Sequence, residues 1–168
     1  LETCTRDVYD STLRIPPTTV HRWALGLASA MRHLHKRGVM HGDFHIGNVM
    51  FNAADGSLAA ILDWELAALG DPLLDLGRLL AAWPDADGEG PLSLKVLPWD
   101  GFPDRDALIG RYAAGCGRNM AWLLWYEVLA CYKLGIILEG TYARACAGLV
   151  DKDVGARLHQ SALALIAR

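Results

Sequence analysis

The sequence predicts a mostly helical α+β domain that contains one small β hairpin. Apolar residues recur at helical spacing through most of the 168 residues. The exception lies between residues 39 and 62, where three short apolar runs are separated by a polar loop and by a turn rich in Asn, Asp and Gly. A chain of this length is expected to form one domain with a substantial core.

The first predicted helix leads directly into the polar loop. The sequence Pro16-Pro17 marks a break, and Thr18 or Thr19 is the expected N-cap. From Val20 onward the apolar positions follow a helical period: Trp23, Leu27, Ala30, Met31 and Leu34. Gly38 is expected to end this helix in a left-handed conformation.

Strands and loops are expected next. The run 49–51 and the run 58–62 are predicted to pair as a hairpin across the turn 52–56, and the run 39–40 forms a further short strand. After Asp63 the sequence 69–72, Leu-Gly-Asp-Pro, breaks the chain again.

The rest of the chain is predicted to be helical around one long loop. The expected helices cover residues 73–83, 105–114, 120–147 and 154–166. Asp104 is the expected cap of the second of these, and Gly135 or Gly140 is expected to interrupt the third. The segment 84–106, with four prolines, is a long loop of the kind that is often functional.

Composition and charge exclude several classes of partner. About half of the residues are apolar (52%), 21% are charged, and the net charge is −3 without a basic block. Electrostatics therefore gives no reason to propose nucleic acid or an anionic membrane surface as a partner. The apolar run 120–138 contains Glu127 and Lys133, so it is interpreted as a protein helix and not as a membrane span. The four cysteines form no CxxC pair and are expected to be buried free thiols in a reducing cytoplasm.

The polar loop carries residues suited to a magnesium–phosphate site. Asp43, His45 and Asn48 lie in the loop, and Asp63 follows the last strand of the hairpin. Carboxylate and amide oxygens are ligands that Mg²⁺ prefers, and phosphoryl transfer also uses a carboxylate beside the acceptor hydroxyl. Asp and Asn also occur as ordinary turn residues. Their occurrence together in this order favours the metal–phosphate interpretation.

The same residues resemble the catalytic segment of a known family. The order His41-Gly42-Asp43, then Asn48, then an apolar strand ending in Asp63, resembles the aminoglycoside phosphotransferase family, which shares the protein-kinase-like fold. The similarity continues through residues 69–77 and reaches Ile137-Leu138-Glu139-Gly140-Thr141-Tyr142-Ala143-Arg144. Those later stretches are most similar to the subgroup related to the kinase-like domain of certain acyl-CoA dehydrogenase family proteins.

The resemblance implies a role for each matching residue. Asp43 would be the catalytic carboxylate that orients an acceptor hydroxyl, and Asn48 and Asp63 would hold Mg²⁺ against the phosphates of ATP. His41 would be a buried scaffold residue, and Asp75 would brace the catalytic loop through backbone N–H groups.

Four further residues have a functional and a structural interpretation. His45 could contact the nucleotide phosphates or serve as scaffold. Glu127, Tyr126 and Tyr142 could bind the substrate, whereas Glu127 could equally pair with Arg or Lys on a neighbouring helix, and aromatic residues at helical spacing are often core.

The resemblance also implies a division into lobes. Residues 20–168 would form the C-terminal lobe of the kinase-like fold, and residues 1–19 would be the end of a linker between lobes. The N-terminal lobe that covers the nucleotide and supplies a lysine is expected to be absent. We therefore expect this chain alone to bind nucleotide weakly and to catalyse little transfer.

The sequence thus predicts an ATP- and Mg²⁺-dependent phosphotransferase that acts on a hydroxyl group of a small molecule. Members of the family act on aminoglycosides, choline-like alcohols, sugars and other hydroxyl compounds. The resemblance therefore leaves open the acceptor, a role in antibiotic resistance, the choice of ATP or GTP, and the oligomeric state. The subgroup implies a hydroxylated acyl-type acceptor.

Two alternatives remain: a non-catalytic kinase-like binding module, and an iron site made of His41, Asp43 and a distant histidine such as His159.

Overall fold

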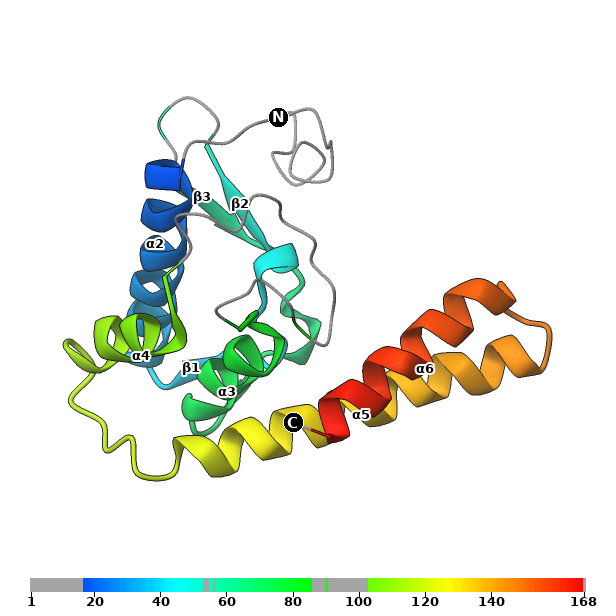
Figure 1. Ribbon diagram of the computed structural model, residues 1–168. Coiled ribbons are helices and arrows are strands. Elements are labelled where there is room, and N and C mark those ends of the chain that lie inside the picture. Colours follow the sequence, from blue (N-terminus) through cyan, green and yellow to red (C-terminus); the bar gives the residue numbers. More distant parts are fainter. Residues whose placement is uncertain (1–16, 53–54, 56, 86–89, 91–102, 168) are drawn as a thin grey trace.

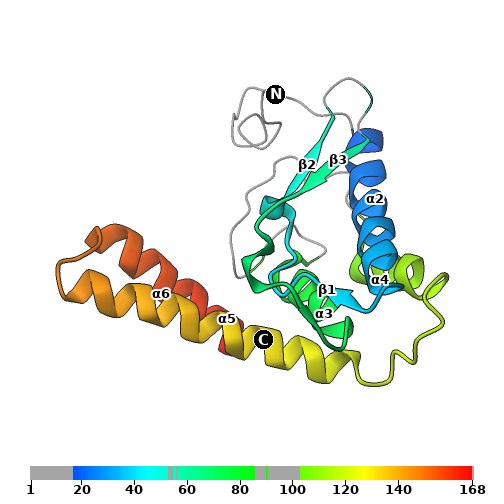
Figure 2. The same ribbon diagram turned by 180° about the vertical axis from the view of Figure 1, so that it is seen from behind.

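The computed structural model describes residues 17–52, 55, 57–85, 90 and 103–167. Helices α2, α3 and α4 and a small β hairpin form one part of the molecule, and a long hairpin of α5 and α6 extends from it (Figure 1). Figure 2 shows the same arrangement from behind. The prediction of a mostly helical α+β chain with a small hairpin is confirmed.

Helix α2 (Pro17–His35) presents an apolar face to the core. Leu27, Ala28 and Met31 are fully buried along this face. The helix begins at Pro17, so the prediction that Thr18 or Thr19 caps it was wrong: a proline presets the backbone for the first helical position. Gly38 follows the helix with a φ of 74°, as predicted, and turns the chain toward the polar loop.

Two pairs of antiparallel strands flank the polar loop. Strand β2 (Val49–Phe51) pairs with β3 (Leu58–Ile61), which confirms the predicted hairpin. Of the turn that joins these strands, residues 53, 54 and 56 lie outside the described part. Strand β1 (Val39–Met40) pairs with β4 (Ala68–Leu69). Strand β4 was not predicted, because two residues next to a Gly-Asp-Pro break give no strand pattern of their own.

Helix α3 (Leu73–Ala82) lies in the centre of the molecule, and α4 (Arg105–Ala113) packs beside α2 (Figure 1). Asp104 caps α4 as predicted, because its Oδ1 accepts a hydrogen bond from the N–H of Ala107 at 2.7 Å. Most of the long loop predicted for residues 84–106 lies outside the described part.

Helix α5 (Leu123–Cys146) and helix α6 (Lys152–Ile166) run antiparallel along each other (Figures 1 and 2). The predicted interruption of α5 was wrong, since Gly135 and Gly140 both lie inside one continuous helix. Gly135 is buried and faces Ile166, so packing between the helices offsets the low helix propensity of glycine. The last helix begins two residues earlier than predicted, because Asp151 caps it.

In the described part of the chain, the core consists of two clusters. The larger joins α2, α3, α4, the β2–β3 hairpin and the start of α5, and its fully buried members include Leu27, Met31, Phe44, Leu76, Leu80, Leu108 and Tyr112. The smaller joins α3, α5 and α6 through Ala81, Ala130, Cys131, Leu134 and Leu165. Cys131 is buried as predicted, whereas Cys116 is half-buried and Cys146 is exposed; Cys4 lies outside the described part. Among the described helices, none combines the length and the apolar character that a membrane span requires.

Candidate active site

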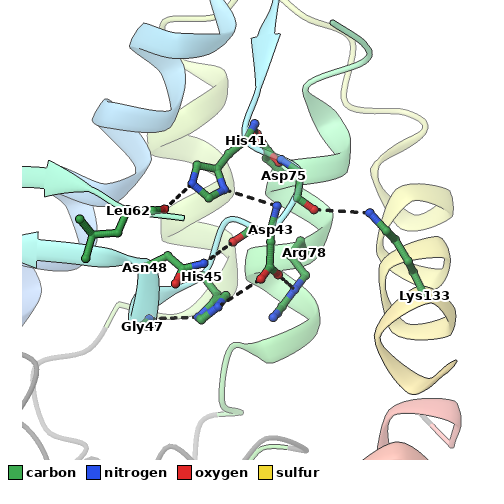
Figure 3. A network of polar contacts seen from close by, with 10 residues as sticks. His41, Asp43, His45, Gly47, Asn48, Leu62, Asp75, Arg78 and Lys133 are labelled. Carbon is green, nitrogen blue, oxygen red and sulfur yellow. Dashed lines mark hydrogen bonds and ion pairs between the residues drawn. The ribbon is translucent and has the colours of Figure 1, made fainter. Parts of the chain in front are cut away.

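Asp75, buried on α3, holds the backbone of the polar loop (Figure 3). Its Oδ2 accepts a hydrogen bond from the N–H of His41 at 2.6 Å, and its Oδ1 accepts one from the N–H of Gly42 at 2.7 Å. These are the backbone contacts expected of this residue. Gly42 has a φ of 85°, and a Cβ at this position would collide with the carbonyl oxygen of Leu66. The loop therefore needs glycine at this point.

A buried series of hydrogen bonds, from Tyr112 through His35, fixes the position of the Asp75 carboxylate. His35 Nε2 donates to Asp75 Oδ2 at 2.9 Å, and His35 Nδ1 lies 2.7 Å from the hydroxyl of Tyr112. Burial raises the pKa of Tyr112 well above its usual value, so the phenol keeps its proton and can donate it to Nδ1. Helices α2, α3 and α4 are thereby joined at the carboxylate that holds the loop.

His41 connects the loop to the end of the hairpin. Its side chain is fully buried, and Nε2 donates to the carbonyl oxygen of Leu62 at 2.7 Å. Its Nδ1 lies 3.4 Å from the N–H of Asp43 and serves as the acceptor. His41 therefore occupies a scaffold position and presents no free nitrogen to a ligand.

The register of the hairpin brings Asn48 and Asp63 to the same end. Val49 pairs with Ile61, and the N–H of Leu62 donates to the carbonyl oxygen of Asn48 at 2.8 Å. The side chain of Asn48 is oriented by a hydrogen bond from Nδ2 to the carbonyl oxygen of Asp43, at 3.1 Å. This contact leaves the amide oxygen Oδ1 as the group that can bind a ligand.

Asp63 has a strained backbone. Its φ of 65° and ψ of 60° place it in the left-handed region, and it is the one non-glycine residue in the described part with a positive φ. Such strain is concentrated at functional sites, where the surrounding structure fixes it. Its exposed carboxylate and the Asn48 amide oxygen are a donor set that suits Mg²⁺, which is held in phosphate sites by one or two protein ligands together with phosphates and water.

Asp43 lies between two cationic or hydrogen-bonding side chains (Figure 3). His45 Nε2 is 3.5 Å from its Oδ2, and Arg78 Nε donates to its Oδ1 at 2.9 Å. The hydrogen bond from His45 and the charge of Arg78 lower the pKa of Asp43 to about 2, against the opposing effect of burial. Asp43 is therefore ionised at neutral pH.

His45 has a local structural contact as well. Its Nδ1 accepts a hydrogen bond from the N–H of Gly47 at 3.1 Å, and in this way it caps the short 3₁₀ turn Ile46–Asn48. Because Nδ1 is the acceptor, Nε2 carries the proton that faces Asp43. The structure thus places His45 beside the predicted catalytic carboxylate.

A cavity of about 90 Å³ borders Asp43. It lies between the loop, α3 and α5 and is lined by Gly42, Asp43, Leu66, Leu74, Arg78, Ala130, Lys133, Leu134 and Ile137. Arg78 and Lys133 are not among the predicted site residues. The sequence could have indicated Arg78 as a site residue, because it is a charged residue three positions after Asp75 in an otherwise apolar helix and therefore lies on the same face.

The residues predicted to bind substrate have other partners and do not line this cavity. Glu127 pairs with Arg105 at 2.5 Å, the ion pair that the sequence analysis held open as an alternative. The hydroxyl of Tyr126 donates to Asp71 Oδ2 at 2.8 Å.

Tyr142 and His159 lie together on the α5–α6 hairpin. Their rings stack with centroids 4.3 Å apart, and His159 Nδ1 lies 2.6 Å from Glu139 Oε1. His159 is thus engaged on the helical hairpin. The described part of the chain contains no group of three or more His, Cys, Asp or Glu side chains placed to hold a metal ion, so the alternative of an iron site gains no support.

Comparison with known proteins gives matches over most of the chain. The model of the phosphotransferase enzyme family (APH) matches residues 10–123, more than half of the sequence. Acyl-CoA dehydrogenase family member 11 of Pongo abelii is 31% identical over 121 residues, which are 68% of this chain and 15% of that protein. Acyl-CoA dehydrogenase family member 10 of Mus musculus is 30% identical over 122 residues, 66% of this chain and 11% of that protein. The chain thus spans less than a sixth of the length of these relatives.

A solved structure shares the fold. The crystal structure of a protein from Ralstonia eutropha that was assigned as an aminoglycoside phosphotransferase superposes with a TM-score of 0.58 at 24% identity. The match covers 96% of this chain and 52% of that protein. The similarity expected from the motifs around Asp43 and from the later stretches is confirmed. The chain belongs to the phosphotransferase enzyme family and has the kinase-like fold of aminoglycoside phosphotransferases, mostly helical with small antiparallel strand pairs.

Proposed function

We propose that this chain is the catalytic and acceptor-binding lobe of an ATP- and Mg²⁺-dependent phosphotransferase that acts on a hydroxyl group of a small molecule. The observation that carries the proposal is the position of Asp43. It is an ionised carboxylate at a cavity, and its backbone carbonyl orients Asn48 at the end of the hairpin that also carries Asp63. Such a set of residues matches the needs of phosphoryl transfer, in which positioning and charge neutralisation dominate.

In this proposal Asp43 orients the acceptor hydroxyl and receives its proton as the oxygen bonds to phosphorus. A carboxylate with a pKa of about 2 is a weak base. A weak base suffices because the transition state of phosphoryl transfer is loose and demands little activation of the nucleophile. The principal role of Asp43 is therefore to orient the hydroxyl, and Arg78 and His45 hold the carboxylate in place for this task.

Asn48 and Asp63 would hold Mg²⁺, which neutralises the charge of the nucleotide phosphates when it is bound. We further propose that a nucleotide-covering lobe outside the residues 20–168 completes the site, and that the protein works in the cytoplasm. The free thiols of Cys116 and Cys146 are in keeping with a reducing compartment.

The Asp43→Ala variant tests the catalytic role. In the full-length protein that contains this chain, we expect the rate of transfer from ATP to a responsive acceptor to fall about 10²- to 10⁴-fold. The Asp106→Ala variant is the control, because Asp106 is an exposed carboxylate on α4. Transfer that continues undiminished in Asp43→Ala would contradict the proposal and favour a non-catalytic binding module.

The Asp63→Asn variant tests the metal role on the chain itself. Calorimetric titration with ATP should show binding that depends on Mg²⁺, and the substitution should weaken this binding about tenfold or more. Residues that only hydrogen-bond to a metal ligand already contribute about tenfold or more to metal affinity, so a direct ligand should contribute at least as much. Asp55→Asn is the matched control, since Asp55 is an exposed carboxylate in the turn of the same hairpin. Equal effects of the two substitutions would show that Asp63 does not bind the metal.

A further inference from the structure

Arg78 has a buried donor without an acceptor. The residue is only 9% exposed, and its Nε donates to Asp43. Its Nη1 is buried as well, and within the described part of the chain it has no hydrogen-bond partner. Leaving a charged donor buried and unpaired is costly, and nearly all such groups in folded proteins have a partner. Because Arg78 lines the cavity beside Asp43, a ligand in that cavity is the natural source of the missing acceptor.

Lys133 approaches the same cavity from the opposite wall. It projects from α5, and its Nζ lies 3.5 Å from the carbonyl oxygen of Gly42 (Figure 3). It forms no ion pair with a carboxylate among the described residues. Among the described residues, two cations, Arg78 and Lys133, and one anion, Asp43, therefore border the cavity, which gives these residues a surplus of one positive charge.

The remaining walls of the cavity are apolar. They are formed by Leu66, Leu74, Ala130, Leu134 and Ile137. Its volume of about 90 Å³ limits the ligand to a small compound with a short carbon chain.

We propose that this cavity is the acceptor site, and that it selects a hydroxyl compound with an anionic group joined to the hydroxyl by a short apolar chain. The anionic group pairs with Arg78 Nη1 and Lys133 Nζ, and the hydroxyl lies at Asp43. This inference rests on the proposed function, because it assigns the acceptor of the same site. It also disfavours a cationic acceptor, which Arg78 and Lys133 would repel.

The anion belongs to the acceptor and not to the nucleotide because of where the cavity lies. In Figure 3, Lys133 lies on one side of Asp43, and Asn48, one of the two proposed metal ligands, lies on the other. The apolar walls supplied by α5 also suit a carbon chain better than a polyphosphate.

Three matched probes test the charge selection by direct binding. We would titrate the chain, without nucleotide, with 5-hydroxypentanoate, 1,5-pentanediol and 5-aminopentan-1-ol, and follow the methyl signals of Ala130 and Leu134 by NMR. These probes share one hydroxyl and a five-carbon chain and differ in the charge at the other end. We expect the hydroxy acid to bind about tenfold or more tightly than the diol, because charge-assisted hydrogen bonds are among the stronger ones.

Two variants locate the effect. Lys133→Met should remove most of the preference for the hydroxy acid while the fold is retained, since Lys133 is exposed. Lys152→Met makes the same change at the exposed start of α6 and should leave the preference intact. Arg78→Met should also remove the preference; if it unfolds the chain, Lys133→Met still decides the question.

The outcomes separate this inference from the proposed function. Equal binding of the hydroxy acid and the diol, or an effect of Lys133→Met no larger than that of Lys152→Met, would overturn the inference. A third result would also overturn the inference: Lys133→Met weakens the binding of Mg²⁺-ATP but not of Mg²⁺-ADP, and the chain binds the hydroxy acid no more tightly than the diol. In that case the cations would bind the terminal phosphate of ATP. None of these measurements requires turnover, so failure of the Asp43→Ala test leaves their result standing.

Discussion

At the scale of single residues, the site depends on how Asp43 is surrounded. Its carboxylate has one contact from the loop, His45, and one from α3, Arg78. Both contacts favour the ionised form, so the residue is ready to accept a hydrogen bond from a hydroxyl over the whole neutral range. The same contacts make it a weak base, which agrees with a role in orientation.

The pKa of Asp43 is a measurable consequence. It should titrate at about 2, below the ordinary value of 3.8, and His45→Asn should raise it because the hydrogen bond from His45 is the largest cause of the shift. The folded-state pKa lies below the unfolded one, so ionised Asp43 stabilises the fold above about pH 3.8, and this contribution is lost as the pH falls toward 2. NMR titration of the side-chain carboxyl carbon measures it, with exposed His21→Asn as the control. An Asp43 that titrates near 3.8 in the unsubstituted chain would contradict this account.

At the scale of secondary structure, α3 is the support of the site. Asp75 and Arg78 are three residues apart on one face of the helix, so the residue that holds the loop and the residue that contacts Asp43 share one rigid support. The adjoining side of α3 packs against α5, which carries Lys133. Gly77 permits this packing, since a Cβ there would lie 2.7 Å from the backbone of Tyr126.

Gly77→Ala should therefore destabilise the chain by about 1–3 kcal/mol, the usual cost of overpacking. Gly110→Ala is the matched control: it lies inside α4, and a Cβ there meets no atom within 4 Å. The control should stabilise the chain by about 0.5–1 kcal/mol, because alanine favours the helix over glycine. Urea unfolding of the two variants measures both effects, and a stabilising Gly77→Ala would show that α3 and α5 are not closely packed.

At the scale of the whole molecule, stability is unevenly distributed. The larger core cluster joins α2, α3 and α4 to the start of α5, whereas the rest of the α5–α6 hairpin contributes to a smaller cluster. Toward the far end of the hairpin, in residues 141–155, only Ala145 and Gly155 are buried. Segments with few buried contacts open locally with little cost in free energy.

Amide hydrogen exchange should reveal this difference. We expect amides of residues 141–155 to exchange faster than those of α3, which is buried along nearly its whole length. Leu165→Ala removes a side chain that is 1% exposed and should cost about 2–5 kcal/mol, with faster exchange throughout α5 and α6. Leu163→Ala, at a position that is 47% exposed, should change little. Uniform exchange across α3 and the hairpin would contradict this prediction.

The sequence by itself determined the features that depend on near neighbours. Helix α4 begins where Asp104 can cap it, α2 is followed by the left-handed Gly38, and β2 and β3 pair across a short turn. The order of Asp43, Asn48 and Asp63 was likewise readable, because Asp and Asn supply oxygen ligands of the kind that a Mg²⁺–phosphate site uses and because this order resembles the family's motif. Each of these features arises from local spacing, side-chain chemistry or turn geometry.

Only the tertiary structure decided the features that join distant residues. The contact of Arg78 with Asp43 spans 35 positions, and the contact of Lys133 with Gly42 spans 91. The pairing of β1 with β4 and the continuity of α5 through Gly135 also depend on partners elsewhere in the chain. Local propensity does not encode such contacts, because they form only when helices and strands pack. The sequence therefore indicated the candidate catalytic loop, whereas the charge of the cavity beside it followed from the way that α3 and α5 meet.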